Sequence, residues 1–316
     1  MRKVVITQKL PYELEDDFRG YQLVYNREDR QMDRADLLLS LRDADALISM
    51  LSDKIDRELI DAAPDLKIIN NYAVGYNNID VDYAKGKGIL VCNTPHVLTE
   101  TTAELAFALM ISVARRIVEA DKFTRMGNFV GWTPNLFLGT DLYRKRVGIY
   151  GFGRIGQAFA RCCHGFEMDI VYTGNTRKYE AELNLGARFV DFDELVSSSD
   201  FIVVLAPLNE KTKHAFNLDT FKKMKKTAIF INAGRGPIVK ESDLAYALKN
   251  GIIRGAGLDV YEYEPEISEE LFDLDNVILL PHIGSASEST REEMAKLCIN
   301  SVKNYLEKGI IPANVI

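Results

Sequence analysis

The chain has 316 residues, of which 47% are hydrophobic and 27% charged, and its formal net charge at pH 7 is −7. This length and composition predict a globular protein with two domains. The basic residues are scattered or form one short cluster at a helix end, Lys222-Lys223-Met224-Lys225-Lys226, which complements the helix dipole, so nucleic acid is not an expected partner.

No run approaches the roughly 18 apolar residues of a membrane span, and the first residues lead directly into a strand-like run. A cytoplasmic protein is therefore expected, without a membrane partner. The cysteines lack C-x-x-C spacing and predict reduced thiols, with no metal site: Cys92, Cys162, Cys163 and Cys298.

Strand-like and helix-like runs alternate through the first hundred residues. The strand-like runs are apolar or β-branched and span 3–7, 21–25, 46–50, 67–72 and 89–92. This alternation predicts a small α/β domain. Pro95 disfavours continuation of the last run, and one long helical pattern from Thr99 to about Met126 is expected to cross to the next domain.

Residues 127–143 form a long, apolar and aromatic connection that holds Trp132, the only tryptophan. A loop of this composition is not expected to remain in water. It either folds back as a local core or buries itself against a second copy of the chain. We favour the second possibility, a homodimer with residues 99–146 at the interface.

The alternation resumes in the second half of the chain. Strand-like runs span 147–150, 169–173, 188–190, 201–205, 227–232, 255–260 and 277–280. They predict a mostly parallel, doubly wound sheet. The final helical stretch, about 286–307, has no strand left to cross to and could return to the first domain. The predicted domains are residues 1–98 with 287–316, for substrate, and residues 99–286, for a dinucleotide.

Gly151, Gly153 and Gly156 follow the run 147–150 with the spacing G-x-G-x-x-G. The first glycine permits a sharp turn, the second leaves room for a pyrophosphate, and the third lets helix and strand pack closely. Three such glycines often mark only a turn. The helical segment 154–165 and the strand-like run that follows it complete a strand–helix–strand unit, which predicts dinucleotide binding.

The second strand of that unit ends in the turn Gly174-Asn175-Thr176-Arg177-Lys178. An NAD-binding unit usually carries Asp or Glu here for the ribose 2′-hydroxyl. Small polar groups followed by two cations suit a 2′-phosphate instead, and the nearest acid, Glu180, comes too late to replace the missing carboxylate. The turn predicts a preference for NADP(H), with NAD(H) possible; the alternative is an ordinary basic turn.

Arg235, Glu264 and His282 each follow one of the last three predicted strands directly. Ligands of open α/β sheets bind at these strand ends. Hydride transfer to a carbonyl carbon requires a proton at the carbonyl oxygen, which an imidazole supplies well, and a neighbouring carboxylate favours its protonated form. A guanidinium grips a substrate carboxylate with two hydrogen bonds.

Taken singly, these residues could be a loop ion pair, a turn acid and a capping residue. Together they predict an anchor for the substrate carboxylate (Arg235), a proton donor (His282) and a carboxylate that favours the protonated form of that donor (Glu264).

Four segments together resemble the D-isomer-specific 2-hydroxyacid dehydrogenases over essentially the whole chain: Gly151–Gly156, Asn232–Gly236, Gly257–Val260 with Glu264-Pro265, and Pro281–Ser285. Further segments resemble the glyoxylate/hydroxypyruvate reductase branch: Thr94-Pro95, Leu98–Glu104 and Asn175–Lys178. The resemblance implies two Rossmann-like, doubly wound parallel-sheet domains, the outer one discontinuous. It also implies the three catalytic roles assigned above.

The resemblance implies further site residues. The backbone at Val74 and Gly75 would receive the substrate carboxylate, and Asp259 would contact the nicotinamide carboxamide. The other expected cofactor-binding residues are Thr102, Gly151, Phe152, Gly153, Arg154, Ile155, Gly156, Gly174, Asn175, Thr176, Arg177, Lys178, Ala206, Pro207, Ala233, Gly234, Arg235, His282 and Gly284. The chain departs from the pattern at Gly174-Asn175, where a longer polar or basic side chain is expected in an NADP-preferring member.

The sequence thus predicts an NADPH-dependent reductase of glyoxylate or hydroxypyruvate. One alternative is a phosphoglycerate, formate or phosphite dehydrogenase on the same scaffold. Another is a dinucleotide-sensing binding protein, because the fold resembles transcriptional corepressors that respond to a bound dinucleotide. Such proteins are expected to carry peptide-binding clefts and disordered tails, and the absence of tails from the sequence pattern favours the enzyme.

Overall fold

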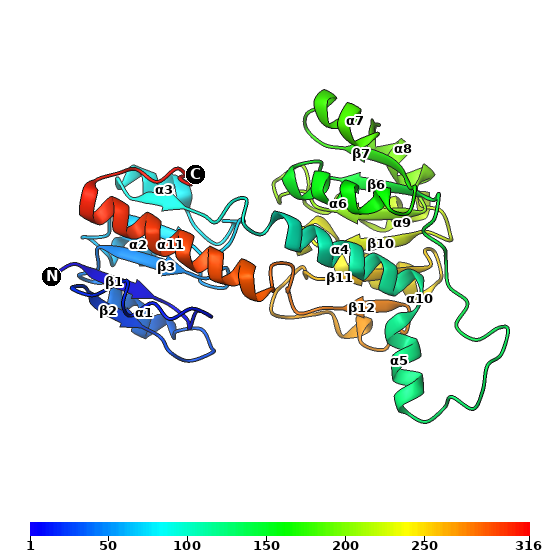
Figure 1. Cartoon of the computed structure of the whole chain (residues 1–316), viewed down its shortest axis with the longest axis horizontal. Coiled ribbons are helices and arrows are strands. Elements are labelled where there is room, and N and C mark those ends of the chain that lie inside the picture. The colour runs from blue at the N-terminus through cyan, green and yellow to red at the C-terminus, as the bar shows by residue number, and fades with distance from the viewer. The chain divides into compact units, whose positions relative to one another are not determined.

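The computed structural model describes residues 1–316, and its contacts divide the chain into two compact units (Figure 1). The first unit comprises residues 1–98 and 285–316, and the second comprises residues 99–284. Each unit has a wholly parallel sheet with helices, so the predicted fold class is confirmed.

The first unit has a five-stranded sheet in the order β2-β1-β3-β4-β5. Its strands are β1 (Lys3–Ile6), β2 (Gln22–Tyr25), β3 (Ala46–Ser49), β4 (Ile68–Asn71) and β5 (Leu90–Cys92). Its helices are α1 (Arg34–Leu41), α2 (Arg57–Asp61), α3 (Val81–Gly86) and α11 (Glu288–Lys308). The C-terminal helix α11 packs against β4, where Asn70 Nδ2 donates to the carbonyl oxygen of Cys298 at 3.4 Å, and this makes the outer domain discontinuous.

The second unit has a seven-stranded sheet in the order β12-β11-β10-β9-β6-β7-β8. Its strands are β6 (Arg146–Tyr150), β7 (Asp169–Thr173), β8 (Arg188–Phe189), β9 (Phe201–Val204), β10 (Ile229–Asn232), β11 (Gly255–Leu258) and β12 (Val277–Leu279). Its α-helices are α4 (Thr99–Ala114), α5 (Ile117–Arg125), α6 (Arg154–His164), α7 (Tyr179–Leu185), α8 (Phe192–Ser198), α9 (Leu218–Lys223) and α10 (Glu241–Lys249). Two short 3₁₀ helices are η1 (Gly236–Ile238) and η2 (Glu269–Leu271).

The strand order reverses beside β6, whose neighbours β7 and β9 lead to opposite edges of the sheet. In doubly wound sheets, ligands bind outside the carboxyl ends of the strands at such a reversal. The glycine motif follows β6 directly. The topology therefore brings the predicted cofactor motif to the expected place in the sheet.

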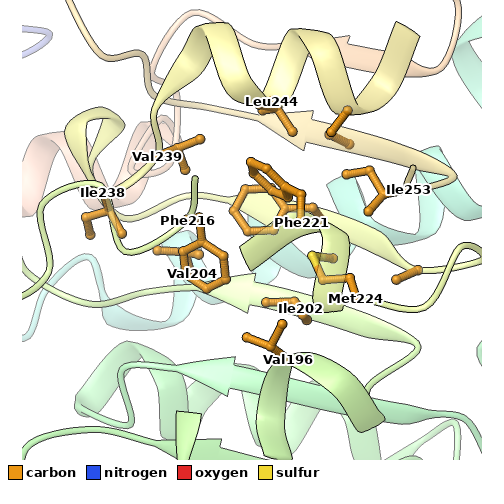
Figure 2. Close-up of a cluster of buried hydrophobic side chains, with 14 of the residues drawn as sticks. Val196, Ile202, Val204, Phe216, Phe221, Met224, Ile238, Val239, Leu244 and Ile253 are labelled. Carbon is orange, nitrogen blue, oxygen red and sulfur yellow. The ribbon is translucent and has the colours of Figure 1, made fainter. Parts of the chain in front are cut away.

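Helices cover both faces of this sheet, so the strands are continuously apolar. Alternate residues of β9 enter different hydrophobic cores: Ile202 and Val204 pack with α8, α9 and α10, whereas Phe201 and Val203 pack with α4 and α6. Figure 2 shows Phe216 in the core that Ile202 and Val204 enter. Burying such a side chain stabilises the fold by about 1.5–3 kcal/mol.

The prediction of one long helix from residue 99 to 126 is wrong. The segment forms two helices, α4 and α5, separated at Arg116, whose backbone is left-handed with a φ of 54°. Arg116 pairs with Glu119 at 2.6 Å and lies 4.9 Å from the centroid of the Phe137 ring. These contacts favour a break in the helix at a position where the sequence has neither glycine nor proline. Helix α4 packs on α6, β10 and β11 within the second unit.

The connection 127–143 is packed only in its second half, where Leu142 is buried. Phe137 meets Phe123 of α5 edge-on, with ring centroids 5.2 Å apart. In the first half, Val130 and Trp132 are 95% and 83% exposed, and the loop runs away from the sheet of its own unit (Figure 1). The alternative of a local core is therefore wrong for the middle of this loop.

None of the helices combines the length and apolar character needed to cross a membrane. All four cysteines are free thiols, and three of them are buried. Burial raises the pKa of the Cys92 thiol to about 12, so this side chain is not a thiolate at neutral pH.

Candidate active site

The glycine motif forms a tight turn between β6 and α6. Gly151 has a φ of +101°, and a Cβ there would lie 2.5 Å from the amide nitrogen of Ala206. A Cβ at Gly156 would lie 2.3 Å from the carbonyl oxygen of Gly151. Both positions therefore exclude a side chain. At Gly153, which caps α6, a Cβ would meet nothing within 4 Å, so the space beside the backbone is open.

The start of α6 faces this open space with unpaired amides. The first helical hydrogen bond runs from the Gln157 amide to the Gly153 carbonyl at 2.9 Å, so the amides of Arg154, Ile155 and Gly156 precede the helical ladder. Such amides and the positive end of the helix dipole suit a phosphate. The residues present thus fit the pyrophosphate of a dinucleotide.

The turn 174–178 lies beside that cradle. The Gly151 amide donates to Thr173 O at 3.0 Å, and a Cβ at Gly174 would meet only the Phe152 amide nitrogen, at 3.8 Å. Phe152 itself is buried and stacks on Tyr172, with ring centroids 4.0 Å apart. The turn at the end of β7 is therefore next to the anion cradle, as a ribose site must be.

The side chains of this turn are exposed, and its two cations differ. Arg177 is paired with Glu182 of α7, with Nε–Oε1 and Nη2–Oε2 distances of 2.9 Å. Lys178 makes no ion pair. Sequence reasoning considered only Glu180 as the nearby acid and missed Glu182, which is five residues beyond Arg177 and becomes its neighbour because α7 begins immediately after the turn.

The ends of β9 and β10 bring four further predicted cofactor residues to the cradle: Ala206, Pro207, Ala233 and Gly234. Ala206 approaches Gly151 closely, as described above. The Ala233 amide donates to the carbonyl of Val204 at 3.2 Å. A Cβ at Gly234 would lie 3.0 Å from Ala206 O, so this strand end also has to remain small.

Thr102, Asp259 and Gly284 also lie together. A Cβ at Gly284 would lie 3.1 Å from Asp259 Oδ2 and 3.4 Å from Thr102 Cγ2. The buried Asp259 carboxylate accepts a hydrogen bond from the Ile283 amide at 2.7 Å. Burial raises the pKa of Asp259, although this amide and the charge of His282 act in the opposite direction.

Arg235 follows β10 on a turn that the side chain of Asn232 shapes. Asn232 Nδ2 donates to the Arg235 carbonyl at 3.1 Å, and Arg235 Nη1 donates to Gly234 O at 2.7 Å. Burial lowers the pKa of the Arg235 guanidinium, and the charge of Glu264 partly offsets this effect. No carboxylate lies at ion-pair distance, so the guanidinium keeps donors for an external anion. The alternative role of Arg235 in a loop ion pair is therefore not seen.

Glu264 and His282 meet directly: Glu264 Oε2 lies 2.8 Å from His282 Nδ1. Glu264 Oε1 accepts a hydrogen bond from the Tyr261 amide at 2.9 Å. Burial would raise the pKa of Glu264, but the hydrogen bond and charge of His282, the Tyr261 amide and the charge of Arg235 outweigh it and hold that pKa below its usual value. With the ring anchored through Nδ1, Nε2 is the atom left to carry or release a proton.

Tyr261 joins the three strand ends and was missed by sequence reasoning. A Cβ at Gly236, next to Arg235, would lie 1.6 Å from the Tyr261 carbonyl oxygen, so the two loops touch. Tyr261 Oη donates to Leu280 O at 2.8 Å, just before the turn that bears His282. The aromatic residue directly after the strand-like run 255–260 was the only available signal.

In the first unit, two buried asparagines hold the backbone at Val74 and Gly75. Asn93 Nδ2 donates to Val74 O, and Asn71 Nδ2 donates to Gly75 O, both at 2.8 Å. The next amides, of Gly75 and Tyr76, point away from these carbonyls because N–H and C=O of a trans peptide are opposed. They have no acceptor within this unit and are suited to bind a carboxylate. Sequence reasoning missed the asparagines, which were visible only as polar residues at strand ends.

Comparisons with known proteins show the family of the chain. Residues 107–284 match the family described as D-isomer specific 2-hydroxyacid dehydrogenase, NAD binding domain. The glyoxylate reductase of Thermococcus onnurineus is 48% identical to this chain over 319 residues, which cover 99% of this chain and 95% of that protein.

Solved structures give the same result. A glyoxylate reductase from Paecilomyes thermophila has a TM-score of 0.88 at 31% identity, with 100% of this chain and 98% of that chain covered. The NADPH-dependent glyoxylate/hydroxypyruvate reductase of Sinorhizobium meliloti, in complex with NADP and malonate, has a TM-score of 0.86 at 32% identity, with 100% and 96% covered. The chain therefore belongs to the D-isomer-specific 2-hydroxyacid dehydrogenases, a family of NAD(P)-dependent enzymes, and groups with its glyoxylate reductases.

Proposed function

We propose that this enzyme reduces small 2-keto acids, glyoxylate or hydroxypyruvate, to 2-hydroxy acids. The observation that carries the proposal is the His282–Glu264 pair at 2.8 Å, next to the unpaired guanidinium of Arg235. When bound, NADPH supplies the hydride for the carbonyl carbon. The side chains have to supply the rest: a proton at the carbonyl oxygen and a grip on the carboxylate.

His282 is proposed to donate that proton from Nε2. Glu264 holds the ring through Nδ1 at 2.8 Å, which leaves Nε2 to face the carbonyl oxygen. After the transfer, the ring is neutral and regains a proton from solvent. Because both side chains are about one third exposed, solvent has access to the pair.

Arg235 is proposed to bind the substrate carboxylate with two parallel hydrogen bonds, which also polarise the adjacent carbonyl. The amides of Gly75 and Tyr76, with the asparagines behind them, are proposed as further donors to a carboxylate. The malonate in the structure of the Sinorhizobium meliloti relative is a small dicarboxylate, which is consistent with a site for carboxylates.

NADPH is the proposed preferred cofactor. In support, the turn 174–178 has no acid, Lys178 is exposed and unpaired, and a relative was solved with NADP. Gly174→Asp tests this preference because the open space at Gly174 accepts a side chain without a clash. The variant is expected to move the ratio of kcat/KM for NADPH over NADH towards NADH by about tenfold or more, the effect of a carboxylate that binds a 2′-hydroxyl and repels a 2′-phosphate.

The test of the reaction is oxidation of reduced nicotinamide with glyoxylate, hydroxypyruvate, pyruvate and phosphohydroxypyruvate, each with NADPH and with NADH. We expect the first two acids with NADPH to give the highest kcat/KM. A preference for phosphohydroxypyruvate would indicate a phosphoglycerate dehydrogenase instead. Turnover of formate or phosphite in the oxidative direction, or binding of dinucleotide without any turnover, would also contradict the proposal.

We further propose a homodimer that buries the middle of the connection 127–143. Phe129, Val130, Trp132 and Leu138 are all more than half exposed in the single chain, which is costly for a contiguous apolar segment. A two-fold contact is the commonest way to bury such a segment. Sedimentation at micromolar concentration is expected to give a dimer, and Trp132→Ala is expected to weaken it. A monomeric parent protein, or a variant unchanged in both mass and KM for the keto acid, would contradict this role.

A further inference from the structure

Helix α7, which directly follows the turn 174–178, contains an acid, Glu182, that opposes the phosphate-binding character of that turn. We propose that Glu182 sets the cofactor selectivity of this enzyme. By pairing with Arg177, it leaves the turn with the charge of one cation instead of two, so NADPH is preferred only modestly and NADH is also accepted. This inference rests on the proposed function, which assigns the adenosine ribose to residues 174–178.

The geometry makes Glu182 a fixed partner of Arg177 and not a passing surface acid. Both carboxylate oxygens are used by the guanidinium, with Nε–Oε1 and Nη2–Oε2 distances of 2.9 Å. Oε1 also accepts a hydrogen bond from the Tyr172 hydroxyl at 2.7 Å. The Glu182 side chain is only 13% exposed. The hydrogen bond from Arg177, then that from Tyr172, holds the pKa of Glu182 below its usual value, so its negative charge is present at neutral pH.

Tyr172 connects this ion pair to the cofactor cradle. Its hydroxyl accepts a hydrogen bond from the Lys178 amide at 2.7 Å, and its ring stacks on Phe152 of the glycine motif at 4.0 Å. Arg177 is further fixed by the Tyr179 ring, whose centroid lies 4.7 Å from Cζ. The Arg177 guanidinium is therefore held at the start of α7, where Glu182 compensates its positive charge. It lies beside the turn 174–178, which is proposed to bind the ribose.

The charge balance predicts how selectivity will respond. A 2′-phosphate carries about two negative charges, so it is attracted by Lys178 and Arg177 and repelled by Glu182, whereas a 2′-hydroxyl has no charge to respond. Removing one unit charge about 8 Å from a doubly charged phosphate in water changes affinity on the order of fivefold. Salt is expected to reduce this effect because the turn is exposed.

The experiment measures equilibrium binding of NADPH and NADH to the full-length protein by nucleotide fluorescence, without substrate. Glu182→Gln keeps the size of the side chain and an acceptor for Tyr172 but removes the charge. It is expected to tighten NADPH binding about fivefold and to leave NADH binding within twofold. The matched control is Glu180→Gln, which removes an exposed acid of the same helix that has no ion pair, and its effect on NADPH is expected to be smaller.

A double-mutant cycle separates compensation of charge from direct recognition by Arg177. Arg177→Gln is expected to weaken NADPH binding because it leaves Glu182 uncompensated. The double variant Arg177→Gln with Glu182→Gln restores the net charge of the parent turn and is expected to return NADPH binding close to the parental value. Circular dichroism of all variants verifies the fold.

Two results would overturn the inference while the proposed function stands. One is a Glu182→Gln variant whose ratio of NADPH to NADH affinity is unchanged or lower. The other is a double variant as weak as Arg177→Gln, which would make Arg177 a direct contact that Glu182 does not oppose. If the parent protein binds neither nucleotide, the assignment of the dinucleotide site fails, and the inference fails with it.

Discussion

Two histidine–glutamate pairs in the second unit have similar geometry and different surroundings. His282 Nδ1 lies 2.8 Å from Glu264 Oε2, and His214 Nε2 lies 2.6 Å from Glu262 Oε1. Both histidines have left-handed backbones, with φ values of 53° and 51°. The glutamates are separated by a single residue. A search for a histidine beside a carboxylate would therefore find both pairs and could not distinguish them.

The His214–Glu262 pair is surrounded by backbone groups. Glu262 Oε2 accepts a hydrogen bond from the Glu241 amide at 2.8 Å. In the same way, Glu241 Oε2 accepts a hydrogen bond from the Glu262 amide at 2.9 Å. The other oxygen of the buried Glu241 accepts from the Ser268 amide at 2.6 Å. The backbone of His214 donates to Pro237 O at 2.9 Å. This pair fixes loops to one another, because both oxygens of Glu262 and the backbone of His214 are used in contacts within the fold.

The His282–Glu264 pair is surrounded by other side-chain charges. Arg235 and Asp259 act on it electrostatically, and His282 Nε2 has no partner within the unit. A histidine–glutamate pair by itself therefore does not make a catalytic site, since each histidine keeps one ring nitrogen without a partner. The charges of Arg235 and Asp259 beside Glu264 and His282 distinguish the pair proposed to act on substrate from the pair that links loops of the fold.

The largest expected effect is that of His282→Asn. Asparagine tolerates a left-handed backbone, so the substitution removes proton transfer without adding strain at this position. Turnover is expected to fall by roughly 10²–10⁴-fold, as is typical when a general acid is lost. Steady-state kinetics measure the loss, and a fluorescence titration with NADPH is expected to show intact cofactor binding. Near-normal turnover would remove His282 from its proposed role.

The second effect concerns Arg235, whose charge acts on Glu264 of the first pair. Arg235→Lys keeps the charge but cannot form two parallel hydrogen bonds to a carboxylate. A hydrogen bond to a charged group contributes about 1.5–3 kcal/mol, so KM for the keto acid is expected to rise about 10- to 100-fold. KM for NADPH serves as the internal control. An unchanged KM for the keto acid would mean that its carboxylate binds elsewhere.

The third effect is on pH dependence. The lowered pKa of Glu264 keeps this group ionised through the neutral range; ionisation favours the folded state above the pKa of an unfolded glutamate, and this contribution is lost as the pH falls through the folded pKa. Glu264→Gln removes this ionisable group, so the free energy of unfolding of the variant is expected to fall less steeply from neutral to acid pH than that of the parent protein. Chemical denaturation at a series of pH values measures this slope. Glu262→Gln is the matched control, and an equal change of slope there would contradict the distinction between the pairs.

The fold and the strand ends of the site could be predicted because they depend on local patterns. The strand-like run 201–205 is apolar throughout because both faces of β9 are covered by helices, and β9 forms at Phe201–Val204. Polar residues directly after such runs come to one edge of a parallel sheet whatever the loops do. This topological rule alone predicts that Arg235, Glu264 and His282 lie near one another, and their roles in the reaction stay predictions.

The contacts that distinguish the two pairs could not be predicted in this way. His214 and Glu262 are 48 residues apart, and their meeting depends on the paths of two irregular loops, for which no periodic pattern exists. Glu241 lies in the first turn of α10, where an acid ordinarily complements the helix dipole and gives no sign of a contact with another loop. The break at Arg116 had no glycine or proline to signal it. In each case, the decisive interaction involves a backbone conformation or a hydrogen bond to backbone, which side-chain patterns do not reveal.

The smallest expected effect is that of His214→Asn, the counterpart of the first substitution in the other pair. The Glu262 side chain is only 7% exposed, so loss of the imidazole leaves a nearly buried carboxylate oxygen short of one partner. Such a loss costs about 1–3 kcal/mol of the free energy of unfolding. For a unit of the size of residues 99–284, thermal denaturation is expected to shift down by about 2–8 °C. Turnover at a temperature where the protein is folded is expected to stay within about threefold of the parental value, because the His214–Glu262 pair lies outside the group of Arg235, Glu264 and His282 that is proposed to act on the substrate. Calorimetry and steady-state kinetics on the same preparation separate the two quantities. A variant with unchanged thermal stability whose turnover falls as far as that of His282→Asn would show that the second pair takes part in proton transfer, and the distinction drawn from their surroundings would be wrong.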